Sequence, residues 1–137
     1  MSKKLPRIGA HTPTSGGMAK RSLGYAETIQ AEAIQVFTSN PRGWATPEPN
    51  PAADEEFRSK AAAMDIATYV HAPFLINLGS PTEGTYKNSL NSTEYSLRRG
   101  KDIGALGVVI HTGSAVDASH VDNAWKQIHE GMMPILE

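Results

Sequence analysis

The sequence predicts an α/β fold of parallel strands, because short apolar runs alternate with stretches of helical periodicity along its 137 residues. Four runs rich in β-forming residues are the predicted strands, at 7–11, 33–39, 68–71 and 107–111. A segment with apolar residues at helical spacing follows each of them. A strand–helix order repeated four times requires parallel pairing through right-handed crossovers. Two architectures satisfy this pattern: a small open α/β sheet, or half of a (β/α)₈ barrel.

The composition is that of an ordinary globular protein, with 39% hydrophobic residues, 20% charged residues and a formal net charge of −1. Because the net charge gives no general attraction for nucleic acid, any DNA contact must come from local residues. The absence of cysteine excludes disulfides and restricts a metal site to nitrogen and oxygen ligands. No apolar run approaches the roughly 20 residues that a membrane span needs, and no secretory signal follows the basic start. The expected location is the cytoplasm, with no membrane partner.

The first two predicted helices have recognisable start signals. Ser15 is the expected cap of the first helix. A proline-rich loop at 40–51 precedes the second helix, which has acidic residues in its first turn, where they suit the helix dipole. The expected buried stripe of this second helix consists of Phe57, Ala61 and Met64.

The third helix is expected at about 86–103, with Leu90 and Leu97 facing inward. The fourth is expected to open with a capping box formed by Ser119 and Asp122. It has the clearest amphipathic stripe in the chain, made of Val121, Trp125, Ile128, Met132 and Ile135.

Three of the five histidines end predicted strands, namely His11, His71 and His111. The carboxyl ends of parallel strands meet at one edge of a sheet, where the loops of such folds place their functional groups. A single histidine there is as a rule a hydrogen-bonded structural residue, so the metal hypothesis rests on the pair His71 and His111. His11 is a candidate for supporting a metal ligand or binding phosphate. His120 and His129, near or on the last helix, are expected to be solvated.

Two predicted loops contain residue types that can contact DNA. In the first, Arg42 can grip a phosphate and Trp44 can pack on a sugar or base, although a surface arginine beside a tryptophan that anchors its own loop is the simpler interpretation. In the second, Phe74 and Leu75 begin an apolar run where polar residues are expected. Such a run usually packs on the core, but apolar side chains facing DNA can wedge into a base step.

Taken together, these segments resemble the endonuclease IV (deoxyribonuclease IV) family of apurinic/apyrimidinic DNA-repair endonucleases. The resemblance extends in order over essentially the whole chain, and the segment at 71–79 is its most specific part. The matching segments are IGAH at 8–11 with the glycines at 16–17, VFT at 36–38 with NPRGW at 40–44, HAPFLINLG at 71–79, and HTGS at 111–114.

The resemblance implies a (β/α)₈ barrel with a trinuclear zinc site that cleaves the phosphodiester on the 5′ side of abasic sites in damaged double-stranded DNA, a step of base excision repair. His71 and His111 match family histidines that bind one of the Zn²⁺ ions. Arg42 matches a loop residue that contacts DNA, and Phe74 and Leu75 match the pair that enters the minor groove. Phe74 replaces the tyrosine common there, which keeps the ring and removes its hydroxyl.

The resemblance also selects the architecture, because a (β/α)₈ barrel typically needs about 250 residues. Residues 1–137 are therefore expected to be the first four βα units, the N-terminal half of a TIM-barrel endonuclease domain, with 40–51 as its proline-rich DNA-contact loop. The family's remaining ligands are carboxylates and histidines on later strands, so no catalytic site is complete here. Glu137 is not counted among the ligands, since it is expected to end the fourth helix.

The chain alone is expected to hold at most a partial zinc site and to lack nuclease activity. It would need the missing C-terminal half of the barrel, or self-association, to cover its open sheet. Two alternatives stay open: a metal-dependent sugar isomerase of similar barrel fold, and a non-catalytic DNA-binding fragment.

Overall fold

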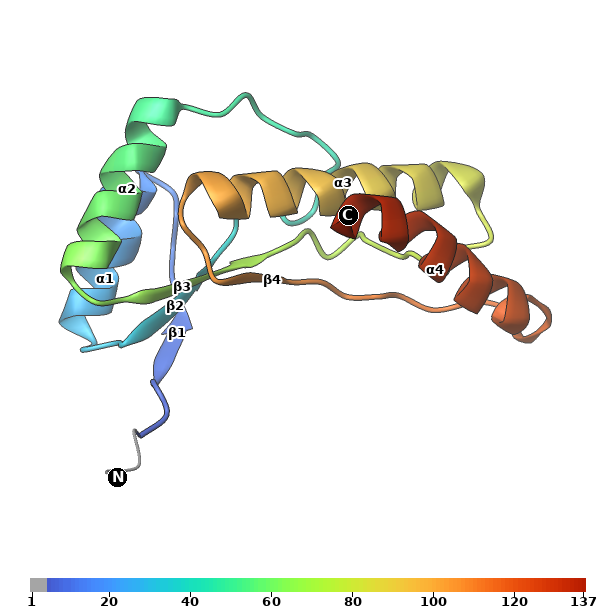
Figure 1. Cartoon of the computed structure of the whole chain (residues 1–137), viewed down its shortest axis with the longest axis horizontal. Helices are drawn as coiled ribbons and strands as arrows, with labels where there is room; N and C mark the ends of the chain where they lie inside the picture. Colours follow the sequence, from blue (N-terminus) through green and yellow to red (C-terminus); the bar gives the residue numbers. More distant parts are fainter. Residues whose placement is uncertain (1–4) are drawn as a thin grey trace.

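In the computed structural model, which describes residues 5–137, four parallel strands form one sheet in the order β1-β2-β3-β4 (Figure 1). The strands are β1 (Gly9–His11), β2 (Ala33–Val36), β3 (Ala67–His71) and β4 (Gly107–Val109). Each strand pairs with the next one along the chain, and the register aligns His11 with Gln35 and His71 with Val109. All four carboxyl ends therefore lie at the same edge of the sheet.

The helical segments follow the strands and gather on one side of the sheet (Figure 1). They are η1 (Met18–Ser22), α1 (Leu23–Thr28), α2 (Pro51–Ala63), α3 (Glu83–Asp102), η2 (Ala118–His120) and α4 (Val121–Leu136). An open doubly wound sheet would reverse its strand order at a switch point and have helices on both faces. Strands in chain order, with helices on one side only, form half of a (β/α)₈ barrel, as predicted.

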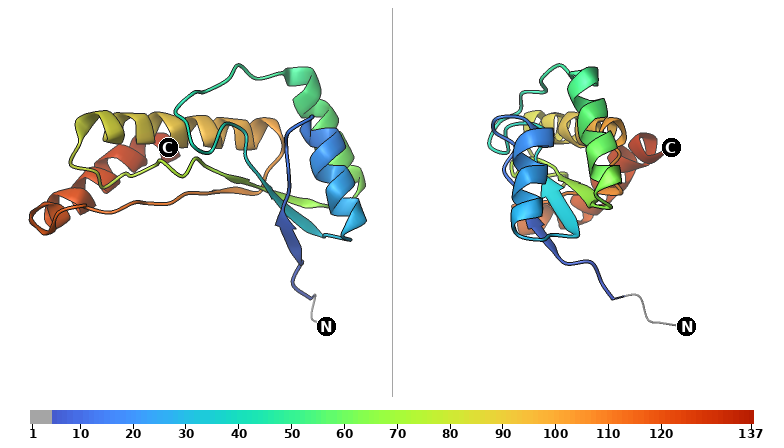
Figure 2. Two further views of the ribbon diagram at one scale, coloured as in Figure 1. Left: turned by 180° about the vertical axis from the view of Figure 1, so that it is seen from behind. Right: turned by 90° about the vertical axis from the view of Figure 1, so that its left-hand side faces the viewer.

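Alternation along β3 shows the two faces of the sheet. Thr68 and Val70 are buried toward the helices, whereas Tyr69 lies on the open face. The main core cluster packs α1 and α2 against the sheet, and these two helices lie side by side in both views (Figure 2). Its buried members are Leu23, Ala26, Ile34, Val36, Phe57, Ala61, Ile66, Val70 and Ile103.

A second, smaller cluster lies beyond the carboxyl ends of β3 and β4. Its buried members, Ala72, Ile76 and Leu78, belong to the loop after β3. Trp44 from the loop before α2, together with Ile128 and Met132 from α4, packs against them. This loop is therefore anchored in a core of its own.

The first two helices differ from expectation in their caps. Ser15 does not cap the first helix: the chain turns at Gly16 and Gly17, both with positive φ, before η1 begins at Met18. The second helix is capped by Asn50, whose side-chain oxygen accepts a hydrogen bond from the N–H of Ala53 over 3.2 Å.

The predicted stripe of α2 is correct at Phe57 and Ala61, which are buried. It is wrong at Met64, which follows the last residue of α2 and is exposed. The stripe therefore ends one turn earlier than the spacing of apolar residues suggests.

Helix α3 uses a buried face that its apolar residues do not reveal. Leu90 and Leu97, predicted to face inward, are only half-buried. Small residues lie against the sheet instead, namely Ser89, Ser92, Thr93, Ser96 and Gly100. Three of their hydroxyls donate to the carbonyl four residues back, which satisfies these groups inside the core.

The start of α4 also differs from expectation. Asp117, rather than Ser119, is the capping residue: its carboxylate accepts from the N–H of Ser119 over 2.7 Å at the start of η2. Trp125, predicted as part of the buried stripe, is 72% exposed, and Val121 is exposed as well. Glu137 ends α4 through its N–H bond to Met133, as expected. Within residues 5–137, no helix combines the length and apolarity that a membrane crossing requires.

Candidate metal and DNA-contact site

The rings of His71 and His111 lie close together at the carboxyl edge of the sheet. His71 ends β3, and His111 follows the last residue of the neighbouring strand by two positions. Their ring centroids are 5.2 Å apart, with an interplanar angle of 61°. Two imidazoles on one tetrahedral Zn²⁺, at Zn–N distances of about 2.0–2.1 Å, place their centroids about 5 Å apart. The separation therefore fits a shared metal ion.

The hydrogen bond of His71 favours the tautomer that a metal ligand needs. Its Nδ1 lies 2.6 Å from the carbonyl oxygen of Ala72. Because a carbonyl can only accept, Nδ1 holds the proton and leaves the lone pair of Nε2 free. Backbone carbonyls orient many metal-binding histidines in this way.

His11 lies beside this pair without joining it. Its ring centroid is 6.3 Å from that of His71, which is wider than a tetrahedral ion would set, and Phe37 contacts both rings. The side-chain oxygen of Gln35 lies 3.1 Å from Nδ1 of His11, a contact that the β1–β2 register makes available. No three histidine, aspartate or glutamate side chains between residues 5 and 137 gather as metal ligands. His71 and His111 are therefore a pair of candidate metal ligands without a third among the described residues.

The two histidines near α4 have different environments. His129 is exposed, as expected. His120 is half-buried rather than solvated, and its Nε2 is a buried atom for which the described part of the chain provides no hydrogen-bond partner. The cause is the position of His120 at the end of η2, where the chain turns into α4.

The loop after β2 is joined to the loop after β3 near the histidines. The N–H of Phe74 donates to the carbonyl oxygen of Pro41 over 2.9 Å. Arg42, the next residue, is exposed, and its N–H donates to the side-chain oxygen of Asn40. Trp44 is half-buried against the second core cluster, so it anchors its own loop. DNA contact by Arg42 and Trp44 stays a prediction.

The apolar run after β3 divides between solvent and core. Phe74 is 47% exposed and Leu75 is 39% exposed, whereas Ile76 is 2% exposed. The ring centroid of Phe74 lies 5.3 Å from that of His71 and 5.9 Å from that of His111. The exposed ring of Phe74 therefore lies directly beside the histidine pair, and the exposed Leu75 follows it in the chain. Sequence reasoning did not single out Asn77 in this loop, although a polar residue inside an apolar run is a signal that its side chain has a specific partner.

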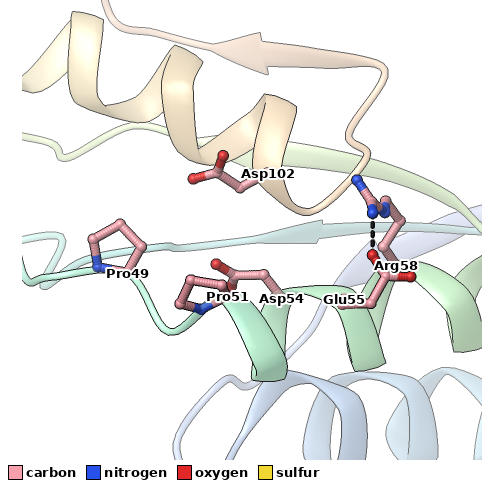
Figure 3. Close-up of a pocket in the computed structure, with 6 residues that line it drawn as sticks. All are labelled: Pro49, Pro51, Asp54, Glu55, Arg58 and Asp102. Carbon is pink, nitrogen blue, oxygen red and sulfur yellow. Dashed lines mark hydrogen bonds and ion pairs between the residues drawn. The ribbon is translucent and has the colours of Figure 1, made fainter.

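A hollow on the helix side, between the start of α2 and the end of α3, lies outside this site (Figure 3). Asp54 and Asp102 line it, and Arg58 pairs with Glu55 at its edge. Arg99 forms two 2.6 Å hydrogen bonds to Asp54 and one of 2.9 Å to Asp102. By accepting the two shorter bonds, Asp54 raises the pKa of the Arg99 guanidinium above its ordinary value. This ion pair joins α2 to α3 and is structural.

Comparison with known proteins gives three kinds of similarity. The model of the family described as "Xylose isomerase-like TIM barrel" matches residues 23–137. A "Probable endonuclease 4" of Streptomyces avermitilis is 53% identical over 130 residues, covering 95% of this chain and 42% of that protein. One from Mycobacterium tuberculosis is 34% identical over 121 residues, covering 88% and 44%. The chain spans about half the length of these curated relatives.

Solved structures give the same result. Endonuclease IV from Thermus thermophilus superposes with a TM-score of 0.77 at 29% identity, covering 91% of this chain and 46% of that one. A D-tagatose 3-epimerase-like protein superposes with a TM-score of 0.69 over 95% of this chain and 47% of that one. At 14% identity, the second likeness shows the fold alone.

Proposed function

We propose that this chain, which belongs to the xylose isomerase-like TIM-barrel family, forms part of a zinc-dependent endonuclease that cleaves DNA on the 5′ side of abasic sites. The observation that supports it best is the His71–His111 pair beside two solvent-facing apolar side chains, Phe74 and Leu75. The similarity to probable endonuclease 4 proteins over most of the chain adds to it. In a cell, this activity would serve base excision repair.

His71 and His111 would hold one Zn²⁺ ion, with Nε2 as the free nitrogen of His71. When bound in such a site, zinc supplies an activated water with a pKa of about 7 and stabilises negative charge on phosphoryl oxygens. The Ala72 carbonyl keeps the His71 ring in the tautomer and orientation that this requires. Further ligands would come from parts of the complete enzyme that residues 5–137 do not include.

Recognition of the lesion would come from the two joined loops. Arg42 would bind a backbone phosphate, where its guanidinium can form two parallel hydrogen bonds. Phe74 and Leu75 would fill the space at the missing base, since apolar side chains stabilise an unstacked step. Solvent exposure of all three side chains at one edge of the sheet supports this role.

The sugar isomerase alternative rests on fold likeness alone, since the epimerase structures are 14% and 12% identical. A pocket for a small sugar has no clear use for two apolar side chains facing solvent at its rim. The exposure of Phe74 and Leu75 therefore favours DNA as the substrate.

Cleavage of a duplex containing one abasic site tests the function in the complete enzyme. His71→Ala and His111→Ala should each abolish most cleavage, whereas His129→Ala, the same change at an exposed histidine on α4, should leave it unchanged. Cleavage on the 3′ side of the lesion, or full activity in both site variants, would contradict the proposal.

Zinc titration tests the partial site in the 137-residue chain. Binding should be weak, because an open catalytic zinc site normally has three protein ligands and His71 and His111 supply two. Nanomolar affinity would mean that this chain contains a further ligand.

A further inference from the structure

The side chain of Asn77 joins the loops that follow β3 and β4. Its Oδ1 accepts hydrogen bonds from the N–H of Gly79 over 3.1 Å and from the N–H of Ser114 over 2.9 Å. Beside this contact, the N–H of Leu78 donates to the carbonyl oxygen of Thr112 over 3.0 Å. The loop after β3 is thereby bonded to the residues that directly follow His111.

Asn77 is itself held by the helices. Its N–H donates to Oγ of Ser89 on α3 over 2.8 Å. From α4, the side-chain amide of Gln127 donates to the carbonyls of Leu78 and Ser80, at 2.9 Å each. Tyr86 completes the connection by donating to the carbonyl of Gln127. The Asn77 oxygen is therefore a fixed acceptor.

The opposite side of the contact requires a glycine. Gly113 has φ of 86°, and a Cβ added there would lie 2.0 Å from Oδ1 of Asn77. The side chain of Asn77 thus closes directly on the backbone of the loop after β4. Such a close approach is possible only where no side chain intervenes.

His111 depends on this contact more than His71 does. His71 is the last residue of β3 and is paired with Val109 in the sheet register, whereas β4 ends at Val109 and leaves His111 exposed in the loop. Loops beyond strand ends are mobile unless something anchors them. The bond from Ser114 to Asn77 is an anchor three residues after His111.

We propose that Asn77 is the positioning residue that fixes His111 at its 5.2 Å separation from His71, and that it does so by joining the two loops. The effect expected on metal binding rests on the proposed function, since the two histidines are the proposed zinc ligands. The same loop presents Phe74 and Leu75, so Asn77 also connects the metal site to the proposed lesion contact.

Three variants of the complete enzyme separate this role from a general effect. Asn77→Ala removes the acceptor, and Asn77→Asp keeps an acceptor oxygen of the same shape. Asn88→Ala makes the same truncation at an exposed asparagine on α3. Backbone hydrogen exchange at Gly79 and Ser114 should rise about 5-fold or more in Asn77→Ala and stay near wild type in the other two. Unchanged exchange at Ser114 in Asn77→Ala would overturn the proposal.

A titration with Co²⁺ alone, followed by visible absorption, measures the consequence for the histidines. Asn77→Ala should weaken Co²⁺ binding about 10-fold or more, and Asn77→Asp should restore it. Faster exchange at Ser114 with unchanged Co²⁺ affinity would overturn the positioning role. His71→Ala and His111→Ala are the reference variants: if neither changes Co²⁺ binding, the proposed zinc site fails, and exchange at Ser114 still decides whether Asn77 joins the loops.

Discussion

The N–H of Phe74 donates to the carbonyl oxygen of Pro41 over 2.9 Å, although the two residues belong to loops that follow different strands. This bond places Arg42 next to the solvent-facing run that begins at Phe74. Trp44 packs against the second core cluster and holds the first loop in place. The proposed phosphate contact at Arg42 and the proposed apolar contact at Phe74 are therefore geometrically coupled, and each can be tested by itself.

Arg42→Ala in the complete enzyme should weaken binding to all DNA duplexes by a similar factor. The slope of log K against log salt concentration should become shallower by about one, the effect of losing one phosphate contact. Arg58→Ala is the matched control, because Arg58 is exposed on α2 and pairs with Glu55. Fluorescence anisotropy across a salt series measures both, and an unchanged slope for Arg42→Ala would exclude the phosphate contact.

Leu75→Ala should mainly reduce discrimination between an abasic duplex and an intact one. Its side chain is half in solvent, so stability should change little, whereas Ile76→Ala in the core should cost about 2–5 kcal/mol. Binding to both duplexes, measured beside urea unfolding, separates the two roles. If binding to both duplexes falls equally after the Leu75 change, Leu75 is not a wedge at the lesion.

The strands and the histidine pair could be predicted from the sequence, because β-forming runs end at His71 and His111 and parallel strands bring their carboxyl ends together. The buried face of α3 could not. Ser92 and Ser96 count as polar residues when the spacing of apolar residues is analysed, so the pattern does not mark them as buried. Their small size nevertheless lets the helix approach the sheet, and packing against the sheet decides which of these hydroxyl residues are buried.

Two other features depend on contacts that spacing does not encode. Ser119 and Asp117 are both capping types, and only the short turn η2 determines that Asp117 accepts the bond. The partner of Asn77 at Ser114 lies 37 residues away, in a loop whose path follows from the pairing of β3 with β4. Tertiary structure therefore selects among local signals that the sequence leaves equivalent.

Removing one partner of the Asp54–Arg99 pair should destabilise the fold more than removing both. Both side chains are almost fully buried, so Arg99→Leu leaves an unpaired buried carboxylate and should cost about 3–5 kcal/mol. The double variant Asp54→Leu with Arg99→Leu should recover most of that loss. Urea unfolding followed by circular dichroism measures all three, and Arg98→Ala, an exposed arginine paired with Glu94, is the control. Equal losses in the single and double variants would mean that packing, rather than charge, determines the effect.

The 137-residue chain by itself should associate and should not cleave abasic DNA. Within residues 5–137, β1 and β4 each pair on one side only, which leaves two strand edges able to bond to another chain. On the open face, Tyr69 is 38% exposed and Val109 is 42% exposed, and each large apolar group left in water forfeits roughly 1.5–3 kcal/mol. A few such losses rival the net stability of a domain, about 5–15 kcal/mol. Light scattering should therefore report dimers or larger species, and an abasic-site cleavage assay should report no activity. A stable monomer that cleaves would mean that His71 and His111 are sufficient without ligands from further strands, and the proposed division of the zinc site would be wrong.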